Sequence, residues 1–222
     1  MPHRCRTATN TLVLIPLGLA LAFTPGPVQA QDNPSHAHIG HVLDGFGQTP
    51  NGEGLLPAAW AEAEVAIQHA GFAARDLEDL DAMKMHAEHV LHGLDPERID
   101  GGPGHGFGVR RAAEGIAQHI GLAADSDGAS DNVQTHAEHV AASARTVAQR
   151  AEEMILLIDE ILATESAAVA APLVQELESH AGELIAGRDA TGDGQISWRE
   201  GEGGLQHVDQ HMGFMAAGEG ID

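Results

Sequence analysis

The sequence predicts an all-α protein, a four-helix bundle made of two repeated helical hairpins and followed by a further helix and a single acidic loop. Composition is the first observation behind this prediction, because the 222-residue chain has 27 glycines, only 3% aromatic residues and no tyrosine. Strands favour aromatic and β-branched residues, so this composition suits close-packed helices better than sheets. The second observation is a repeat with an offset of 50 residues.

Two segments of the chain recur at this single offset. Residues 64–74 (Glu-Val-Ala-Ile-Gln-His-Ala-Gly-Phe-Ala-Ala) correspond to residues 114–124 (Glu-Gly-Ile-Ala-Gln-His-Ile-Gly-Leu-Ala-Ala). Residues 86–90 and residues 136–140 both read His-Ala-Glu-His-Val. A weaker copy of this second motif, His-Ile-Gly-His-Val-Leu, begins at His38. We interpret each full copy as one helical hairpin, and two such hairpins make a four-helix bundle.

Capping residues set the expected helix limits. Pro57 suits the first turn of a helix, and Asp79 or Asp81 is a good cap for the helix that follows it. Ser130 is the corresponding cap in the second copy. The expected helices cover about residues 57–78, 80–93, 109–124, 131–164 and 166–187.

The first 30 residues have the features of a signal peptide. Arg4 and Arg6 precede an uncharged apolar run over residues 11–23, and Val28 and Ala30 fit a small-residue cleavage site. A membrane anchor is the alternative, but this run is shorter than the ~20 residues that a spanning helix needs. We therefore expect cleavage after Ala30 and no membrane span in the mature chain.

The only cysteine, Cys5, would leave with this segment. The mature chain would then have no disulfide, no thiolate metal site, no c-type haem attachment and no cysteine for a lipid anchor. An exported protein without disulfides is more typical of the bacterial periplasm than of eukaryotic secretion. We expect a periplasmic or secreted protein.

The chain divides into four expected parts. The signal peptide is followed by a histidine-containing segment, the repeated bundle, and a C-terminal part with a helix, the acidic loop and a glycine-rich end. These parts cover residues 1–30, 31–54, 55–165 and 166–222.

Charge restricts the possible partners. The chain has 33 acidic and 11 basic residues, a net charge of −22, and loses two of its arginines with the leader. Nucleic acid is excluded as a partner because phosphate binding needs clustered Lys and Arg. Metal cations are the favoured partners, although plain solubility is an alternative reason for acidity. The sequence identifies no protein partner.

Residues 189–200 (Asp-Ala-Thr-Gly-Asp-Gly-Gln-Ile-Ser-Trp-Arg-Glu) resemble the calcium-binding loop of the EF-hand family. Gly194 falls at the sixth position, where that loop turns sharply. The resemblance implies Ca²⁺ bound by side-chain oxygens, one backbone carbonyl, one water-holding residue and a bidentate carboxylate at the last position. In that order, these ligands are Asp189, Thr191 and Asp193, then Gln195, Ser197 and Glu200.

The loop also departs from the family. Gly201, Gly203 and Gly204 follow it, so we expect its exit helix to be short or broken. Only one such loop is visible, which favours a structural calcium clamp over a switch. An Asp- and Gly-rich surface turn is the alternative.

Repeated histidines predict a second kind of metal site. His86 and His89 lie three residues apart on one helix face, as do the histidines of the second copy. Hairpin geometry adds one histidine from the preceding helix to each pair. The predicted groups are His69, His86 and His89, and His119, His136 and His139. Three imidazoles suit Cu(II), Ni(II) or Zn(II).

The other histidines receive separate interpretations. We expect His92, His105 and His180 to be structural, and we expect His36, His38 and His41 to form a mobile metal-capturing tail. His207 and His211 form an i, i+4 pair near two methionines, for which packing is the commoner use.

The His-Ala-Glu-His and Gln-His-Ala motifs, behind a signal peptide and without cysteines, resemble small periplasmic metal-binding proteins with histidine-rich repeats. The resemblance covers about residues 60–145, although this chain has fewer histidines per helix and adds the calcium loop. It implies a four-helix bundle that buffers or carries copper and other divalent metals.

We therefore expect an exported calcium-binding protein that also binds copper, nickel or zinc, and we do not expect an enzyme. Di-iron bundle enzymes use Glu-x-x-His motifs, which this chain lacks. The alternatives are a calcium-stabilised interaction module with structural histidines and a haem protein with two histidine ligands.

Overall fold

The computed structural model describes Met1 and residues 33–221. The predicted signal peptide and its cleavage point after Ala30 therefore lie outside the described residues, apart from Met1.

The described part of the chain is all-α, which confirms the predicted class, and it contains seven α-helices and no strand. The two 3₁₀ turns, Pro50–Gly52 and Pro96–Arg98, lie in connecting loops. The α-helices are α1 Pro34–Leu43, α2 Leu55–Ala73, α3 Leu80–Leu94, α4 Val109–Asp125, α5 Asp131–Ala163, α6 Ala167–Ala186 and α7 Leu205–Glu219.

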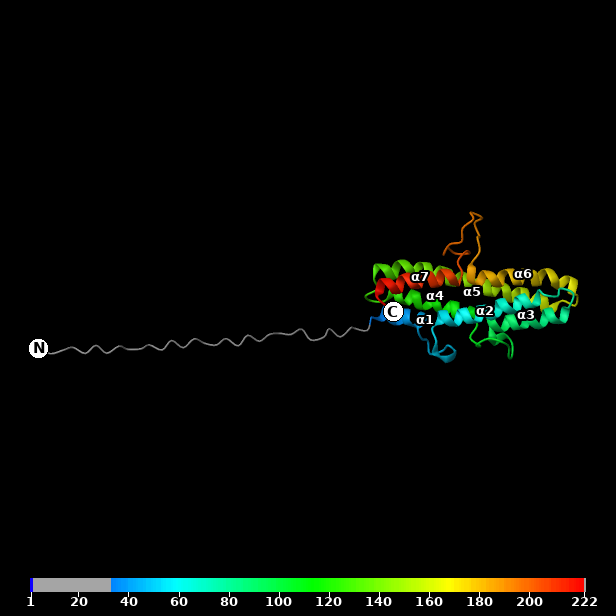
Figure 1. Cartoon of the computed structure of the whole chain (residues 1–222), viewed down its shortest axis with the longest axis horizontal. Coiled ribbons are helices and arrows are strands. Elements are labelled where there is room, and N and C mark those ends of the chain that lie inside the picture. The colour runs from blue at the N-terminus through cyan, green and yellow to red at the C-terminus, as the bar shows by residue number, and fades with distance from the viewer. Residues whose placement is uncertain (2–32, 222) are drawn as a thin grey trace. The chain divides into compact units, whose positions relative to one another are not determined.

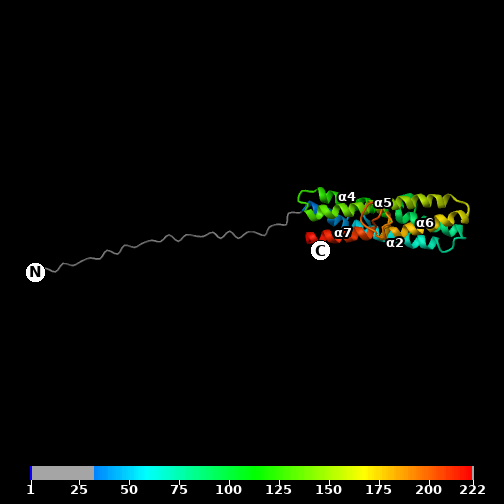
Figure 2. The ribbon, with the colours of Figure 1, turned by 90° about the horizontal axis from the view of Figure 1, so that it is seen from above.

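The helices of residues 33–221 are arranged as four antiparallel rods (Figure 1). The first rod is α1 followed by α2, the second is α3 followed by α4, the third is α5 alone, and the fourth is α6 followed by α7. Residues 44–54, 95–108 and 187–204 interrupt three rods midway and project from the bundle as loops (Figure 1). Seen from above, the orange loop of residues 187–204 lies over the middle of the bundle (Figure 2). The third rod is a single continuous helix of 33 residues.

Side-chain caps fix the starts of several helices. Asp79 accepts a hydrogen bond from the N–H of Ala82 at the start of α3, and Ser130 accepts one from the N–H of Val133 at the start of α5. Both are residues that the sequence analysis expected as caps. Each satisfies one backbone donor that the first helical turn leaves free.

Residues 33–54 are packed against the bundle, in contrast to the mobile tail expected for His36, His38 and His41. This segment contains α1, in which Ile39 and Val42 are fully buried in the common core. The first helix packs mainly against α4. The physical reason is its own apolar pair, which lies on one face at i and i+3 and joins the core of the bundle.

The core follows the helical period along every rod. In α4, for example, Ala112, Ile116, Ile120 and Ala123 are buried, at steps of four, four and three residues. This spacing is typical of a helix that turns one narrow stripe toward its neighbours. No helix in the described part is both long and apolar enough to cross a membrane.

Candidate metal centres

Three clusters of three histidines lie on the bundle. In each cluster, one ring nitrogen from every histidine lies within 4.8 Å of one from each of the others. The clusters are His38, His41 and His119, the first triad; His69, His86 and His89, the second triad; and His136, His139 and His211, the third triad.

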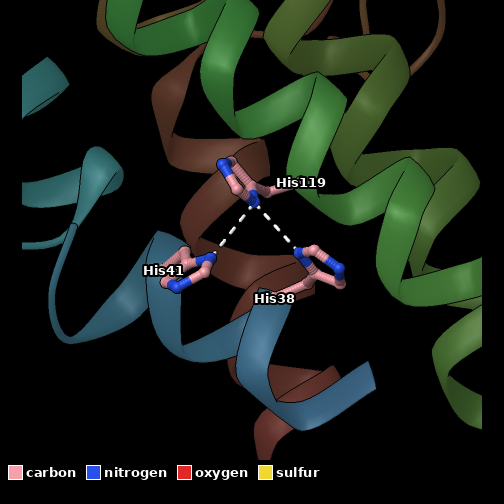
Figure 3. A group of neighbouring side chains, drawn as sticks. All are labelled: His38, His41 and His119. Atoms are coloured by element: carbon pink, nitrogen blue, oxygen red, sulfur yellow. Dashed lines mark hydrogen bonds between the residues drawn. The ribbon is translucent and has the colours of Figure 1, made fainter. Parts of the chain in front are cut away.

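The first triad joins α1 to α4 (Figure 3). His119 points from α4 toward His38 and His41 on α1 (Figure 3). Its Nδ1 atom lies 3.1 Å from Nδ1 of His38 and 3.3 Å from Nδ1 of His41. The ring of Phe46 stands edge-on to that of His119, with ring centroids 5.0 Å apart.

The second triad joins α2 to α3 with nearly the same geometry. Nδ1 of His69 lies 3.1 Å from Nδ1 of His86 and 3.2 Å from Nδ1 of His89. Phe72 stands edge-on to His69 at a centroid distance of 5.2 Å. This is the group that the sequence analysis predicted for the first hairpin.

The third triad joins α5 to α7. Nδ1 of His211 lies 3.1 Å from Nδ1 of His136 and 3.3 Å from Nδ1 of His139. Phe214 stands edge-on to His211 at 5.7 Å. The ring of Trp198 stacks on the ring of His139.

The three triads share one plan. One helix supplies a pair of histidines three residues apart, and a facing helix supplies a central histidine that contacts both. The central histidines, His69, His119 and His211, each belong to a Gln-His-x-Gly sequence. Three copies of one arrangement, on three pairs of helices, indicate a repeated site rather than an accidental cluster.

Each ligand position has the same relation to the core. His38, His86 and His136 directly precede the buried residues Ile39, Ala87 and Ala137, and the other six histidines also precede buried residues. The side chains therefore lie on the same edge of the buried stripe, viewed along the chain. This common register places every one of them at a contact between two neighbouring rods.

The direction of the rods decides which neighbour each histidine meets. Neighbouring rods run in opposite directions. The edge of the buried stripe that carries the histidines therefore faces the second rod when it lies on the first rod, and faces the first rod when it lies on the second rod. Histidines on the first and second rods therefore face each other. For the same reason, histidines on the third rod face those on the fourth.

The predicted grouping of His119 with His136 and His139 is wrong, and the direction of the rods is the reason. His119 lies on the second rod and turns back to α1, whereas His136 and His139 lie on the third rod and turn forward to α7. The predicted grouping follows if the second hairpin is a copy of the first. In the structure α4 runs in the opposite direction to α2, so its histidine turns to the other neighbouring rod.

His211 is the one triad residue that was not among the predicted metal ligands or the predicted tail. It was considered only as the partner of His207, four residues earlier. The signal was present as Gln210-His-Met-Gly-Phe214, a third copy of the Gln-His-Ala-Gly-Phe sequence at residues 68–72. His38 and His41, assigned to the tail, complete the first triad.

The spacing of the ring nitrogens suits a metal ion. Zinc–imidazole bonds of about 2.0–2.1 Å place the nitrogens of two ligands about 3.3–3.6 Å apart in a tetrahedral or trigonal site. In each triad the two contacts of the central histidine are 3.1–3.3 Å. The ring nitrogens of the other two histidines lie within 4.8 Å of each other, so one ion could contact all three rings after side-chain adjustment.

Hydrogen bonding alone satisfies the triads poorly. Nδ1 of a neutral imidazole carries either one proton or one lone pair. The central Nδ1 of each triad has two partners, so it cannot make two full hydrogen bonds with them. One cation at the meeting point would accept all three lone pairs at once.

The surroundings of the central histidines lower their pKa. Burial is the main cause for His69, His119 and His211, and the other imidazoles of each triad add to it. The pKa of His211 falls from 6.5 to about 4. Burial also lowers the pKa of His86 and His136. An imidazole with a lowered pKa stays neutral near pH 7, which is the form that binds metal.

The contact between α5 and α6 holds charged groups where a fourth triad would lie. His180 begins a His-Ala-Gly sequence in α6 and precedes the buried Ala181. Its ring nitrogens lie 3.1 Å from Glu183 and 3.7 Å from Glu176. Arg150 pairs with the same Glu183 at 3.3 Å. His180 is therefore a matched control for the triads.

The predicted calcium loop lies between α6 and α7. The carboxylate of Asp189 accepts hydrogen bonds from the backbone N–H groups of Gly192, Asp193 and Gly194, at 2.6, 3.2 and 2.8 Å. The bond from Gly194 is the main cause that lowers the pKa of Asp189. Gln195 donates its N–H to Asp193 at 2.8 Å. The first half of the loop is thus wound around the Asp189 carboxylate.

The second half of the loop is closed by Glu202. Ser197 donates both its N–H and its hydroxyl to Glu202, at 3.1 and 2.6 Å. Glu200, the expected bidentate ligand, is exposed and makes no side-chain hydrogen bond within the described part of the chain. The exit helix also differs from the expectation, since α7 begins only at Leu205 but then runs for 15 residues.

Two further histidines, His92 and His105, have ordinary partners. His92 is buried and its Nδ1 lies 2.8 Å from the carbonyl oxygen of Pro103. His105 lies 3.5 Å from Glu53. Neither belongs to a triad, in line with the structural role expected for both.

Comparison of the chain with protein families, with curated proteins and with solved structures found no match. The assignment of function therefore depends on the geometry of the sites.

Proposed function

We propose that the protein binds three divalent transition-metal ions, one in each histidine triad, and thereby buffers or carries copper, nickel or zinc. One observation supports this most directly: the same three-histidine arrangement occurs three times, each time with the central Nδ1 atom 3.1–3.3 Å from the Nδ1 atoms of the other two histidines. A structural role for the histidines would not require the same atom to converge in each case.

The donor set defines the class of metal. Each triad offers three neutral imidazoles, which suit copper, nickel and zinc. Three ligands leave at least one position of a tetrahedral ion open to water or to an exchanging ligand. A site of this kind can pass its ion to another molecule, which suits a buffer or a carrier.

The triads favour single ions over haem. A haem iron bound by two histidines has the porphyrin plane between their rings. In each triad a third imidazole lies within 4.8 Å of both others and would occupy that plane. We therefore prefer three metal ions to a haem bound by two histidines.

Export is part of the proposal. The proposed signal peptide would deliver the chain to the periplasm or the outside of the cell, where a buffering protein meets incoming metal. A chain without cysteine after residue 30 would bind these ions without thiol oxidation.

Metal stoichiometry tests the proposal. The mature protein, freed of metal with a chelator, would be titrated with Zn²⁺ and with Cu²⁺, and bound metal would be measured by elemental analysis after gel filtration. We expect three ions per chain. His69→Ala, His119→Ala and His211→Ala should each remove one ion, and His180→Ala should remove none. Unchanged stoichiometry in all three triad variants would mean that the histidines are structural.

We also propose that the α6–α7 loop binds Ca²⁺. The supporting observation is the Asp189 carboxylate, which is held by three successive backbone N–H groups beside Thr191 and Asp193. These residues offer oxygen donors, which Ca²⁺ prefers to nitrogen. Calorimetric titration of the metal-free protein with Ca²⁺ tests this second site, and Asp189→Asn should abolish the binding.

A further inference from the structure

Glu202 is buried although it is charged. Its exposed fraction is only 2%. One carboxylate oxygen, Oε2, accepts the two hydrogen bonds from Ser197. The other oxygen, Oε1, is buried and has no hydrogen-bond partner within the described part of the chain. A buried carboxylate oxygen without a partner is costly, so its environment calls for a cation or a donor.

Glu202 faces the same loop as Asp189. The hydroxyl of Thr191 lies 3.4 Å from Asp189 Oδ1, and Thr191 is among the groups that lower the pKa of Glu202, after Ser197. The two carboxylates are close enough to repel each other. None of Asp189, Asp193 and Glu202 has an ion-pair partner among the described residues. Three carboxylates therefore belong to this loop, and no ion pair among the described residues balances their charge.

The backbone after Arg199 explains why Glu202 turns inward. The N–H groups of Glu202 and Gly203 both donate to the carbonyl oxygen of Arg199, at 3.0 and 3.2 Å. Gly201 has φ +84°, a left-handed conformation that few residues other than glycine adopt. Its N–H donates to the Thr146 hydroxyl on α5 at 3.0 Å. This turn buries Glu202 and leaves Glu200 outside.

We propose that Glu202 takes the place of Glu200 as the carboxylate that closes a Ca²⁺ site with Asp189, Thr191 and Asp193. The inference rests on the calcium-binding part of the proposed function and names its closing ligand. These donors are all oxygens, and three of them are carboxylates, which matches the preference of Ca²⁺. A bound ion would give Glu202 Oε1 its missing partner and would neutralise the repulsion from Asp189.

Two matched variants of the full mature chain test this assignment. Glu202→Gln and Glu200→Gln each remove one negative charge at nearly constant volume, two residues apart. We expect Glu202→Gln to weaken Ca²⁺ binding at least tenfold in a calorimetric titration and Glu200→Gln to change it less than twofold. The reverse order would overturn the assignment of Glu202 while leaving calcium binding by the loop intact.

Two further measurements keep the outcomes separate. If the wild type itself does not bind Ca²⁺, both the site and its closing ligand are wrong, whereas the zinc stoichiometry of the triads is unaffected. If Glu202→Gln fails to fold, as judged by circular dichroism, the wild-type protein with ¹³C-labelled glutamate carboxylates replaces it. Addition of Ca²⁺ should then shift the Glu202 carboxylate resonance and not that of Glu200. An unshifted Glu202 resonance at saturating Ca²⁺ would overturn the assignment.

Discussion

The indole ring of Trp198 stacks on the imidazole ring of His139, with ring centroids 3.9 Å apart and ring planes inclined by 28°. Trp198 belongs to the α6–α7 loop, and His139 belongs to α5 and the third triad. The hydroxyl of Ser143, one turn further along α5, donates to the carbonyl oxygen of Trp198 at 3.3 Å. One of the two tryptophans of the chain therefore contacts one of the three proposed metal sites.

This contact makes Trp198 a reporter of the third triad. In a Trp60→Phe background, which leaves Trp198 as the only tryptophan, Cu²⁺ bound to His139 should strongly quench the fluorescence. The quenching follows from direct contact between the indole and a paramagnetic ion's ligand. His211→Ala should remove the saturable part of the quenching, whereas His69→Ala should preserve it. Equal effects of both variants would contradict the position of the site.

The metal-free protein should lose stability as the pH falls from about 6.5 to about 4. Burial lowers the pKa of His211 in the folded protein to about 4, whereas in the unfolded chain it is near 6.5. Between these values the unfolded chain binds a proton that the folded chain does not, so acid favours unfolding. The loss from this residue should be on the order of 3 kcal/mol.

Urea unfolding of chelator-treated protein at pH 7 and at pH 4.5 measures this effect. A His211→Gln variant has no proton to gain at this position and should show a smaller difference between the two pH values. The lowered pKa of His69 and His119 acts in the same direction, so some dependence should persist. An equal dependence in wild type and variant would refute the prediction.

Arg150 should be a main anchor of the α6–α7 loop. Its guanidinium is only 2% exposed and donates to the carbonyl oxygens of Glu183, Gly201 and Gly203, at 2.8, 3.3 and 3.4 Å. Arg150→Met should destabilise the protein by about 3 kcal/mol, because it leaves buried carbonyl groups without their donor and removes one of the positive partners of Glu183. Urea unfolding measures the change.

Arg145 provides the matched control for this substitution. It lies on the same helix but is exposed. Arg145→Met should change the free energy of unfolding by no more than about 0.5 kcal/mol. Similar values for the two variants would mean that the loop does not depend on Arg150.

The sequence was sufficient for the local structure. The limits of α3 to α6 and the caps at Asp79 and Ser130 were predictable because they depend on neighbours along the chain. The expected helix over residues 57–78 instead covers Leu55–Ala73, and α1 and α7 were not among the expected helices. The second triad was predictable for a similar reason: His69, His86 and His89 belong to one hairpin. A short turn brings them together with little dependence on the rest of the fold.

The first and third triads depend on contacts that the hairpin argument does not contain. His119 meets His38 on α1, and His136 meets His211 on α7, at separations of 81 and 75 residues. Their pairing follows from the direction of each rod within the bundle. The sequence did carry the signal in its third Gln-His-x-Gly copy, and the copy at His38 was visible but was assigned to a tail.

Glu202 illustrates a different limit. The twelve-residue pattern pointed to Glu200 because it counts positions along the loop. The structure turns the chain at Gly201 instead and ties it to Thr146 on α5. A contact with a helix 55 residues earlier is not encoded in the spacing of the loop itself.

Metal stoichiometry in two double variants tests the central claim, that the triads are formed across rods. His38→Ala with His119→Ala damages only the first triad, so this protein should retain two bound Zn²⁺ ions. His119→Ala with His136→Ala damages the first and third triads, so this protein should retain one. If the two double variants bind the same number of ions, the grouping of the histidines described by the structure is contradicted.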